Sequence, residues 1–162
     1  MGLLSGRRDG CGCGWCRRIG YLVEDPSRLL DGLSEALTSH ALTLLSAPAG
    51  SGKTTLLAAF SLAYPGVPLA WLSLDAEDNA PTPFLLSLTT ALQSLSPGCG
   101  AATRALLVSL TDPAAELPHL MSVLINEVME SLPDPFILVL DDLHQITEAA
   151  IYASLDHLLE RP

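Results

Sequence analysis

The most informative stretch of the sequence is Ala47-Pro-Ala-Gly-Ser-Gly-Lys-Thr54. It follows a short apolar run, residues 41–46, whose length and composition are typical of a strand buried on both faces. After it, the pattern predicts a helix from Lys53 to about Ala63. A glycine-containing turn between a buried strand and a helix is the setting of a phosphate-binding loop, so the sequence predicts such a loop here.

The residue types in this loop suit a bound phosphate chain. Gly50 and Gly52 can adopt left-handed backbone conformations, which turn successive N–H groups toward an anion. Lys53, the only lysine of the chain, would place its charge on the β and γ phosphates, and the Thr54 hydroxyl would bind Mg²⁺. The loop departs from the pattern G-x-x-x-x-G-K-[ST] at Ala47, where the following proline favours extended backbone. The alternative is an ordinary strand-to-helix turn without a ligand.

Further strands and helices alternate along the chain. Apolar runs predict strands at residues 68–74 and 136–140. Helical spacing and capping signals predict four more helices: one through residues 29–37, one from Pro81 to about Leu95, one with Asp112 as N-cap and Pro113 at its first position, and one over residues 151–159. This alternation predicts an α/β fold with a parallel sheet covered by helices on both faces. Because three strands are few for such a sheet, we expect another strand after Pro162.

The second element of the predicted nucleotide site is the pair Asp141-Asp142, directly after the strand at residues 136–140. Ligands gather at the carboxyl ends of the strands in open α/β sheets. In phosphoryl-transfer sites, one acid at this position holds Mg²⁺ and the next can orient the attacking water. We therefore predict Asp141 as a metal ligand and Asp142 as the catalytic, water-positioning residue. The alternative is that both acids only cap the loop that follows.

The charge balance excludes some classes of partner. Lys and Arg number 8 and Asp and Glu 18, which gives a formal net charge of −10. This acidic balance argues against a broad face for nucleic-acid phosphates or for an anionic membrane. The sequence has neither a membrane-length apolar run nor the apolar core of a secretory signal, so we expect a cytoplasmic protein without membrane partners.

The first residues differ in composition from the rest of the chain. Residues 1–20 hold six of the 12 glycines and three of the 4 cysteines. We predict a flexible Gly/Cys/Arg-rich leader over residues 1–24 and one folded domain over residues 25–162. Cys11, Cys13 and Cys16 offer three soft ligands, but a structural zinc site needs four, so a metal site in the leader is the less favoured interpretation.

Three segments together resemble the nucleotide-binding domain of MalT-like LuxR-family regulators, which belong to the STAND class of P-loop ATPases. They are Ser46-Ala-Pro-Ala-Gly-Ser-Gly-Lys-Thr-Thr55, then Ala70-Trp-Leu-Ser-Leu-Asp75 with Asp78-Asn79, then Leu138-Val-Leu-Asp-Asp-Leu-His144. The similarity covers roughly residues 26–160 and is more specific than the phosphate loop alone. It implies the N-terminal part of a P-loop NTPase domain, with about three strands of a five-stranded core in the order 2-3-1-4-5. The nucleotide-binding residues that it implies are Ala49, Gly50, Ser51, Gly52, Lys53, Thr54 and Thr55.

The resemblance also implies ligands and partners. ATP with Mg²⁺ would act as the ligand and the switch, and self-association would be linked to nucleotide. A helical-repeat sensor region and a DNA-binding C-terminal helix-turn-helix are expected beyond residue 162. The fourth strand of the family, with its phosphate-sensing arginine, is expected there as well. The chain is therefore interpreted as a fragment with little ATP turnover.

Three alternative functions can be compared with the sequence, and it argues against two of them. A small P-loop kinase would need several arginines in its lids, and between Lys53 and residue 160 the chain has only Arg104. A fragment that binds nucleotide without turnover agrees with the lack of an arginine finger in this stretch. A DNA-binding regulator in its own right is disfavoured by the net charge and by the lack of a helix-turn-helix pattern in residues 26–160.

Overall fold

The computed structural model describes residues 18–19, 26–48 and 50–159. Contacts divide the chain into two compact units, Met1–Pro65 and Gly66–Pro162. The leader expected over residues 1–24 lies almost entirely outside the described residues, and so do Cys11, Cys13 and Cys16. The described part of this segment is a two-residue strand, β1 (Arg18–Ile19).

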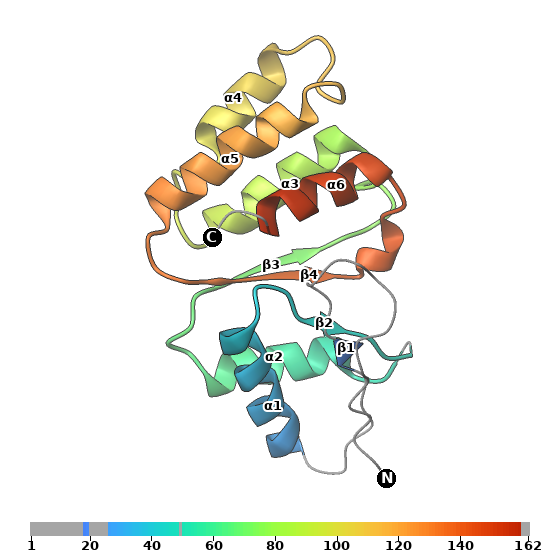
Figure 1. Ribbon diagram of the computed structural model, residues 1–162, viewed down its shortest axis with the longest axis vertical. Helices are drawn as coiled ribbons and strands as arrows, with labels where there is room; N and C mark the ends of the chain where they lie inside the picture. Colours follow the sequence, from blue (N-terminus) through green and yellow to red (C-terminus); the bar gives the residue numbers. More distant parts are fainter. Residues whose placement is uncertain (1–17, 20–25, 49, 160–162) are drawn as a thin grey trace. The chain divides into compact units, whose positions relative to one another are not determined.

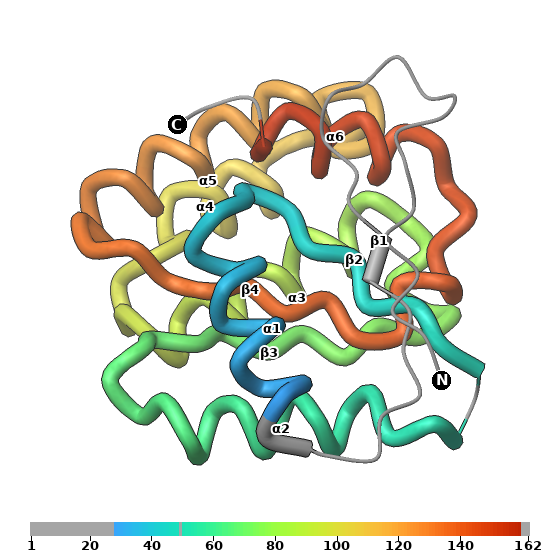
Figure 2. The backbone as a smooth tube through the Cα atoms, turned by 60° about the horizontal axis from the view of Figure 1, so that its bottom comes forward, coloured from blue at the N-terminus to red at the C-terminus, as the bar shows by residue number. Residues whose placement is uncertain are grey.

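The first unit contains two helices and a short pair of strands. Its elements are β1, α1 (Pro26–Ser39), β2 (Leu44–Leu45) and α2 (Lys53–Ala63). β1 pairs with β2 in parallel, with Arg18 opposite Leu44, and α1 lies beside α2 (Figure 2). α2 has the bounds that the sequence predicted, whereas the strand expected over residues 41–46 is reduced to two residues. Pro65 closes the helix because it cannot continue the hydrogen-bond ladder.

The second unit is organised around two parallel strands, β3 (Leu69–Ser73) and β4 (Ile137–Asp141). They pair along their full length, from Leu69 opposite Ile137 to Ser73 opposite Asp141. Side chains of a strand alternate between its faces, and Leu72 belongs to the buried core while Leu138 and Leu140 pack against it. The parallel pairing of the two predicted strands is thus confirmed.

Four helices complete the second unit: α3 (Pro81–Gln93), α4 (Ala101–Ser109), α5 (Leu117–Ser131) and α6 (Ala149–Leu159). Figure 1 shows all four on one face of β3 and β4, so the helix layers expected on both faces are not found within this unit. The described strands form two separate two-stranded sheets rather than one three-stranded sheet. None of the helices in the described ranges has the length and apolar character of a membrane span.

One helix prediction needs correction, and one helix has no counterpart among the predictions. The helix expected to start at Asp112 and Pro113 starts instead at Leu117, after a turn over residues 113–116. The reason is Pro118, which is tolerated in the first turn of a helix but would break one that had begun at Pro113. α4 was not predicted, although its Leu107 is buried in the core.

Candidate functional site

The loop before α2 has the backbone that a phosphate-binding loop needs. Gly50 has φ 75° and Gly52, the N-cap of α2, has φ 83°, so both lie in the left-handed region that favours glycine. A Cβ added at either position would meet no atom within 4 Å, so the requirement for glycine is conformational rather than steric. The N–H of Ser51 donates to the carbonyl of Pro48 at 3.2 Å and closes the turn. Ala49, also predicted in this site, lies outside the described residues.

The side chain of Lys53 folds back over this loop. Its Nζ donates to the carbonyl oxygen of Ala47 at 3.0 Å and to that of Pro48 at 3.3 Å. The ammonium group is therefore held above the loop, one residue from the left-handed Gly52. The start of α2 carries no acidic residue in its first turn and no capping side chain. The Lys53 ammonium and the N-terminus of α2 both favour the binding of an anion.

These residues fit a magnesium nucleotide chemically. Thr54 and Thr55 are exposed in the first turn of α2, where a hydroxyl can reach Mg²⁺ beside bound phosphates. No group of three or more His, Cys, Asp or Glu in the described ranges could hold a metal ion by itself. In proteins, Mg²⁺ is usually held by one or two protein oxygens together with phosphate oxygens and water.

The acid pair has a fixed and unusual geometry at the end of β4. The carbonyl of Asp141 accepts a hydrogen bond from the N–H of Leu74 at 3.0 Å, which continues the pairing with β3. Asp142 has φ 57° and ψ 33°, and no other non-glycine residue in the described part of the chain has a positive φ. Its N–H donates to Oδ1 of Asp141 at 3.1 Å. Left-handed Asp residues are uncommon and cluster at functional positions.

A short 3₁₀ helix, η1 (Leu143–Gln145), follows the acid pair. It carries His144, whose Nδ1 lies 3.6 Å from Oδ1 of Asp142. Both side chains are more than half exposed, so this contact is weak. We assign no role to His144 beyond this contact.

The turn after β3 reaches the same end of the sheet. Asn79 Oδ1 accepts hydrogen bonds from the N–H groups of Thr147 and Glu148, at 2.7 and 2.9 Å. Asp78 is buried and accepts a hydrogen bond from the hydroxyl of Ser87 at 2.6 Å. From the sequence, Asp78 and Asn79 are recognised only as part of a family motif. The available signal was the cluster of Asp and Asn directly after a strand, which is typical of a side-chain-stabilised turn.

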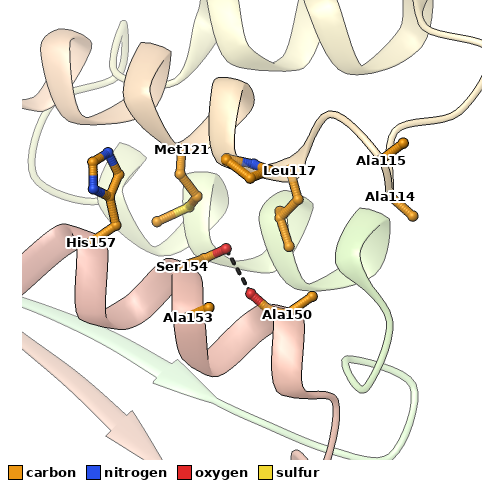
Figure 3. A pocket seen from close by; sticks show the side chains of 9 residues that line it. Ala114, Ala115, Leu117, Met121, Ala150, Ala153, Ser154 and His157 are labelled. Atoms are coloured by element: carbon orange, nitrogen blue, oxygen red, sulfur yellow. Dashed lines mark hydrogen bonds between the residues drawn. The ribbon is translucent and has the colours of Figure 1, made fainter.

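The predicted site residues fall into two groups. The phosphate loop belongs to the first unit, and Asp141 and Asp142 belong to the second. Two cavities of the second unit involve neither group. One, of about 270 Å³, lies between α5 and α6, where Leu117, Met121 and His157 line it (Figure 3). The other, of about 520 Å³, lies between β3 and α3 beside Trp71.

Comparison with known proteins gives the family. The chain is 39% identical over 132 residues to the HTH-type transcriptional regulator MalT of Yersinia enterocolitica, 35% to that of Cronobacter sakazakii and 38% to that of Yersinia pestis. Each alignment covers 82% of this chain and 14% of the relative, so the chain spans about a seventh of the length of these regulators. No solved structure matches it significantly. The family model described as an AAA ATPase domain matches residues 24–162, and the chain belongs to this family.

Proposed function

We propose that this chain is the ATP-binding switch part of a MalT-type transcriptional regulator. The observation that carries the proposal is the position of Lys53, whose ammonium lies over a loop containing two left-handed glycines at an acid-free helix start. Membership of an ATPase domain family and the likeness to MalT regulators support it. The fold proposed is the P-loop NTPase core, of which this chain supplies the first part.

In this proposal the loop binds the phosphate chain of ATP. The ammonium of Lys53 would exchange the carbonyls of Ala47 and Pro48 for phosphate oxygens, a stronger charge-assisted contact. The backbone from Ala49 to Gly52 would surround the phosphates, with Thr55 completing the first turn of α2. The left-handed conformations of Gly50 and Gly52 suit a loop whose backbone N–H groups turn toward an anion.

Thr54 and Asp141 would hold the Mg²⁺, and Asp142 would orient the attacking water. When bound, Mg²⁺ neutralises charge on the phosphates. Ligands of open α/β sheets gather at the carboxyl ends of the strands, which is where Asp141 stands on β4. The left-handed Asp142, whose N–H orients the Asp141 carboxylate, supports a functional role for this turn.

The remaining properties of a MalT-type regulator are proposed for the whole protein. The relatives are HTH-type transcriptional regulators, and we place DNA binding in a region outside the aligned residues because this chain has a net charge of −10. Nucleotide-linked self-association is proposed as the output of the switch, in a cytoplasmic protein.

A second candidate is nucleotide binding without turnover. Arg104 is the only arginine between Lys53 and residue 160. Its guanidinium donates to the hydroxyl of Thr90, on α3, at 3.2 Å. An arginine finger is worth about 10³ to 10⁵ in rate, so a chain without one is expected to bind ATP but hydrolyse it slowly.

Titration calorimetry with ATP and Mg²⁺ tests the proposal. Lys53→Ala is expected to abolish binding, because it removes the cation of the loop, whereas Asp142→Ala is expected to bind ATP like the wild type. Arg104→Ala is the matched control for loss of a cation and should leave the affinity unchanged. If Lys53→Ala and Asp142→Ala both keep the wild-type affinity, the assignment is wrong.

A further inference from the structure

Asn79 ties the turn after β3 to the start of α6. Its Oδ1 accepts hydrogen bonds from the N–H groups of Thr147 and Glu148, and its Nδ2 donates to the hydroxyl of Thr147 at 2.9 Å. These residues directly precede α6, which starts at Ala149. Asn79 therefore anchors the two residues that lead into α6 from a segment 68 residues away, whereas the N–H of Ala150 inside the helix bonds the neighbouring Glu148 side chain at 3.3 Å.

The turn that carries Asn79 is held in place. Oδ1 of Asp75 accepts a hydrogen bond from the N–H of Glu77 at 2.7 Å. Asp78 is 6% exposed as a residue, and its carboxylate accepts hydrogen bonds from the N–H of Asp75 at 3.1 Å and from the hydroxyl of Ser87 at 2.6 Å. Because these bonds fix the turn, the amide of Asn79 is oriented in advance.

The segment from Asp142 to Glu148 is held at both ends by the connection that follows β3. At one end, the N–H of Leu74 bonds the carbonyl of Asp141 at 3.0 Å. At the other end, Asn79 bonds Thr147 and Glu148. Between these points lies the left-handed Asp142, whose N–H donates to the carboxylate of Asp141. The Asp142 N–H, which lies in this segment, is thus one of the contacts that orient the Asp141 carboxylate.

We propose that Asn79 is a positioning residue for Asp141: it fixes the segment after the acid pair, so that the N–H of Asp142 holds the Asp141 carboxylate ready for Mg²⁺. This inference rests on the proposed function, which makes Asp141 a magnesium ligand. A residue that only anchored the start of α6 would affect stability without affecting Mg²⁺ binding. The test therefore needs a measurement that responds to Mg²⁺ binding.

The readout is the ratio of ATP affinity with Mg²⁺ to ATP affinity without it, measured by calorimetry on the full chain. Asn79→Ala removes three ordinary hydrogen bonds and should lower this ratio about tenfold, with the Mg²⁺-free affinity unchanged. Asn79→Asp should keep the wild-type ratio, because a carboxylate can accept both N–H bonds at a helix start. Thr147→Val, which loses only the bond from Nδ2, should change the ratio less than about twofold.

Asn126→Ala, at an exposed position of α5, is the control for loss of an asparagine and should behave like the wild type. Amide hydrogen exchange at Thr147 and Glu148 should be faster in Asn79→Ala, which shows that the segment is released. If Asn79→Ala does not fold, Asn79→Ser replaces it, because its shorter side chain cannot reach both N–H groups.

The outcomes distinguish a failure of the role of Asn79 from a failure of the proposed function. Faster exchange in Asn79→Ala with an unchanged Mg²⁺ ratio makes Asn79 a structural anchor only and overturns the inference, while the proposed function stands. Unchanged exchange at Thr147 and Glu148 also overturns it. Wild-type protein that shows no Mg²⁺-dependent ATP binding overturns the proposed function, and the role of Asn79 falls with it.

Discussion

Glu127, on α5, accepts two hydrogen bonds from Thr103, on α4: one from the backbone N–H at 2.9 Å and one from the hydroxyl at 2.6 Å. The other carboxylate oxygen accepts the N–H of Ala102 at 2.8 Å. A negative charge at the start of a helix is stabilising, and these bonds satisfy N–H groups that have no partner within the helix. One side chain of α5 therefore fixes the start of α4.

Glu127→Ala is expected to lower the free energy of unfolding by about 2 to 3 kcal/mol, because it removes three hydrogen bonds to a charged group. Urea denaturation followed by circular dichroism measures the change. Glu130→Ala, an exposed acid on the same helix, should cost less than about 0.5 kcal/mol. An equal effect of the two substitutions would show that the cap contributes nothing.

Gly100→Ala is expected to destabilise the second unit by more than about 2 kcal/mol. Gly100 has φ 79°, and a Cβ there would lie 2.8 Å from Cβ and Cγ2 of the fully buried Thr89. Backbone strain and overpacking thus act together. Gly98→Ala is the matched control, since its Cβ would meet no atom within 4 Å. Thermal denaturation of both variants checks the prediction, and a Gly100→Ala protein as stable as Gly98→Ala would contradict it.

Because the thiol of Cys99 is buried, we expect the free energy of unfolding to depend on pH in the alkaline range. Burial, and to a lesser extent the nearby charge of Glu127, raise the pKa of this thiol above its ordinary value of 9.0. The folded state therefore keeps the thiol protonated to a higher pH than the unfolded chain does. This contribution to stability is fully present below pH 9 and is lost as pH rises through the raised pKa.

The measurement for Cys99 is the free energy of unfolding of wild type minus that of Cys99→Ala, followed from pH 7 upward. We expect a constant difference up to about pH 9 and a falling difference above it. A difference that stays constant throughout the alkaline range would mean that the Cys99 thiol ionises equally easily in both states.

Gly52→Ala is expected to weaken ATP binding. The position has φ 83° with open space around it, so alanine costs about 1 kcal/mol of backbone strain or relaxes to another conformation. Either response disturbs the loop under Lys53. Gly66→Ala, in a turn of ordinary φ with equally open surroundings, is the control. Calorimetry with ATP should show a loss for Gly52→Ala, and equal affinities for both variants would refute the need for a left-handed residue.

Local sequence predicted some elements well and missed others for identifiable reasons. α2 begins directly after Gly52, the last glycine of its turn signal, and β3 and β4 coincide with short apolar runs bounded by proline and acids. α4 was missed because the carboxylate that caps it comes from Glu127, which lies 24 residues from Thr103. The start of α5 was misplaced because Asp112-Pro113 is a good local start signal, whereas Pro118 forbids a helix through it.

The chemistry of the phosphate loop was readable in the chain itself: the spacing of Gly50, Gly52 and Lys53 concerns neighbouring residues, and backbone preferences act over such short distances. The role of Asn79 was decided by tertiary structure. Its partner Thr147 is 68 residues away, and the two meet only because β3 and β4 pair in parallel and end at the same edge. A hydrogen bond between distant segments has no local signature, since it exists only after the strands that carry its two ends have come together.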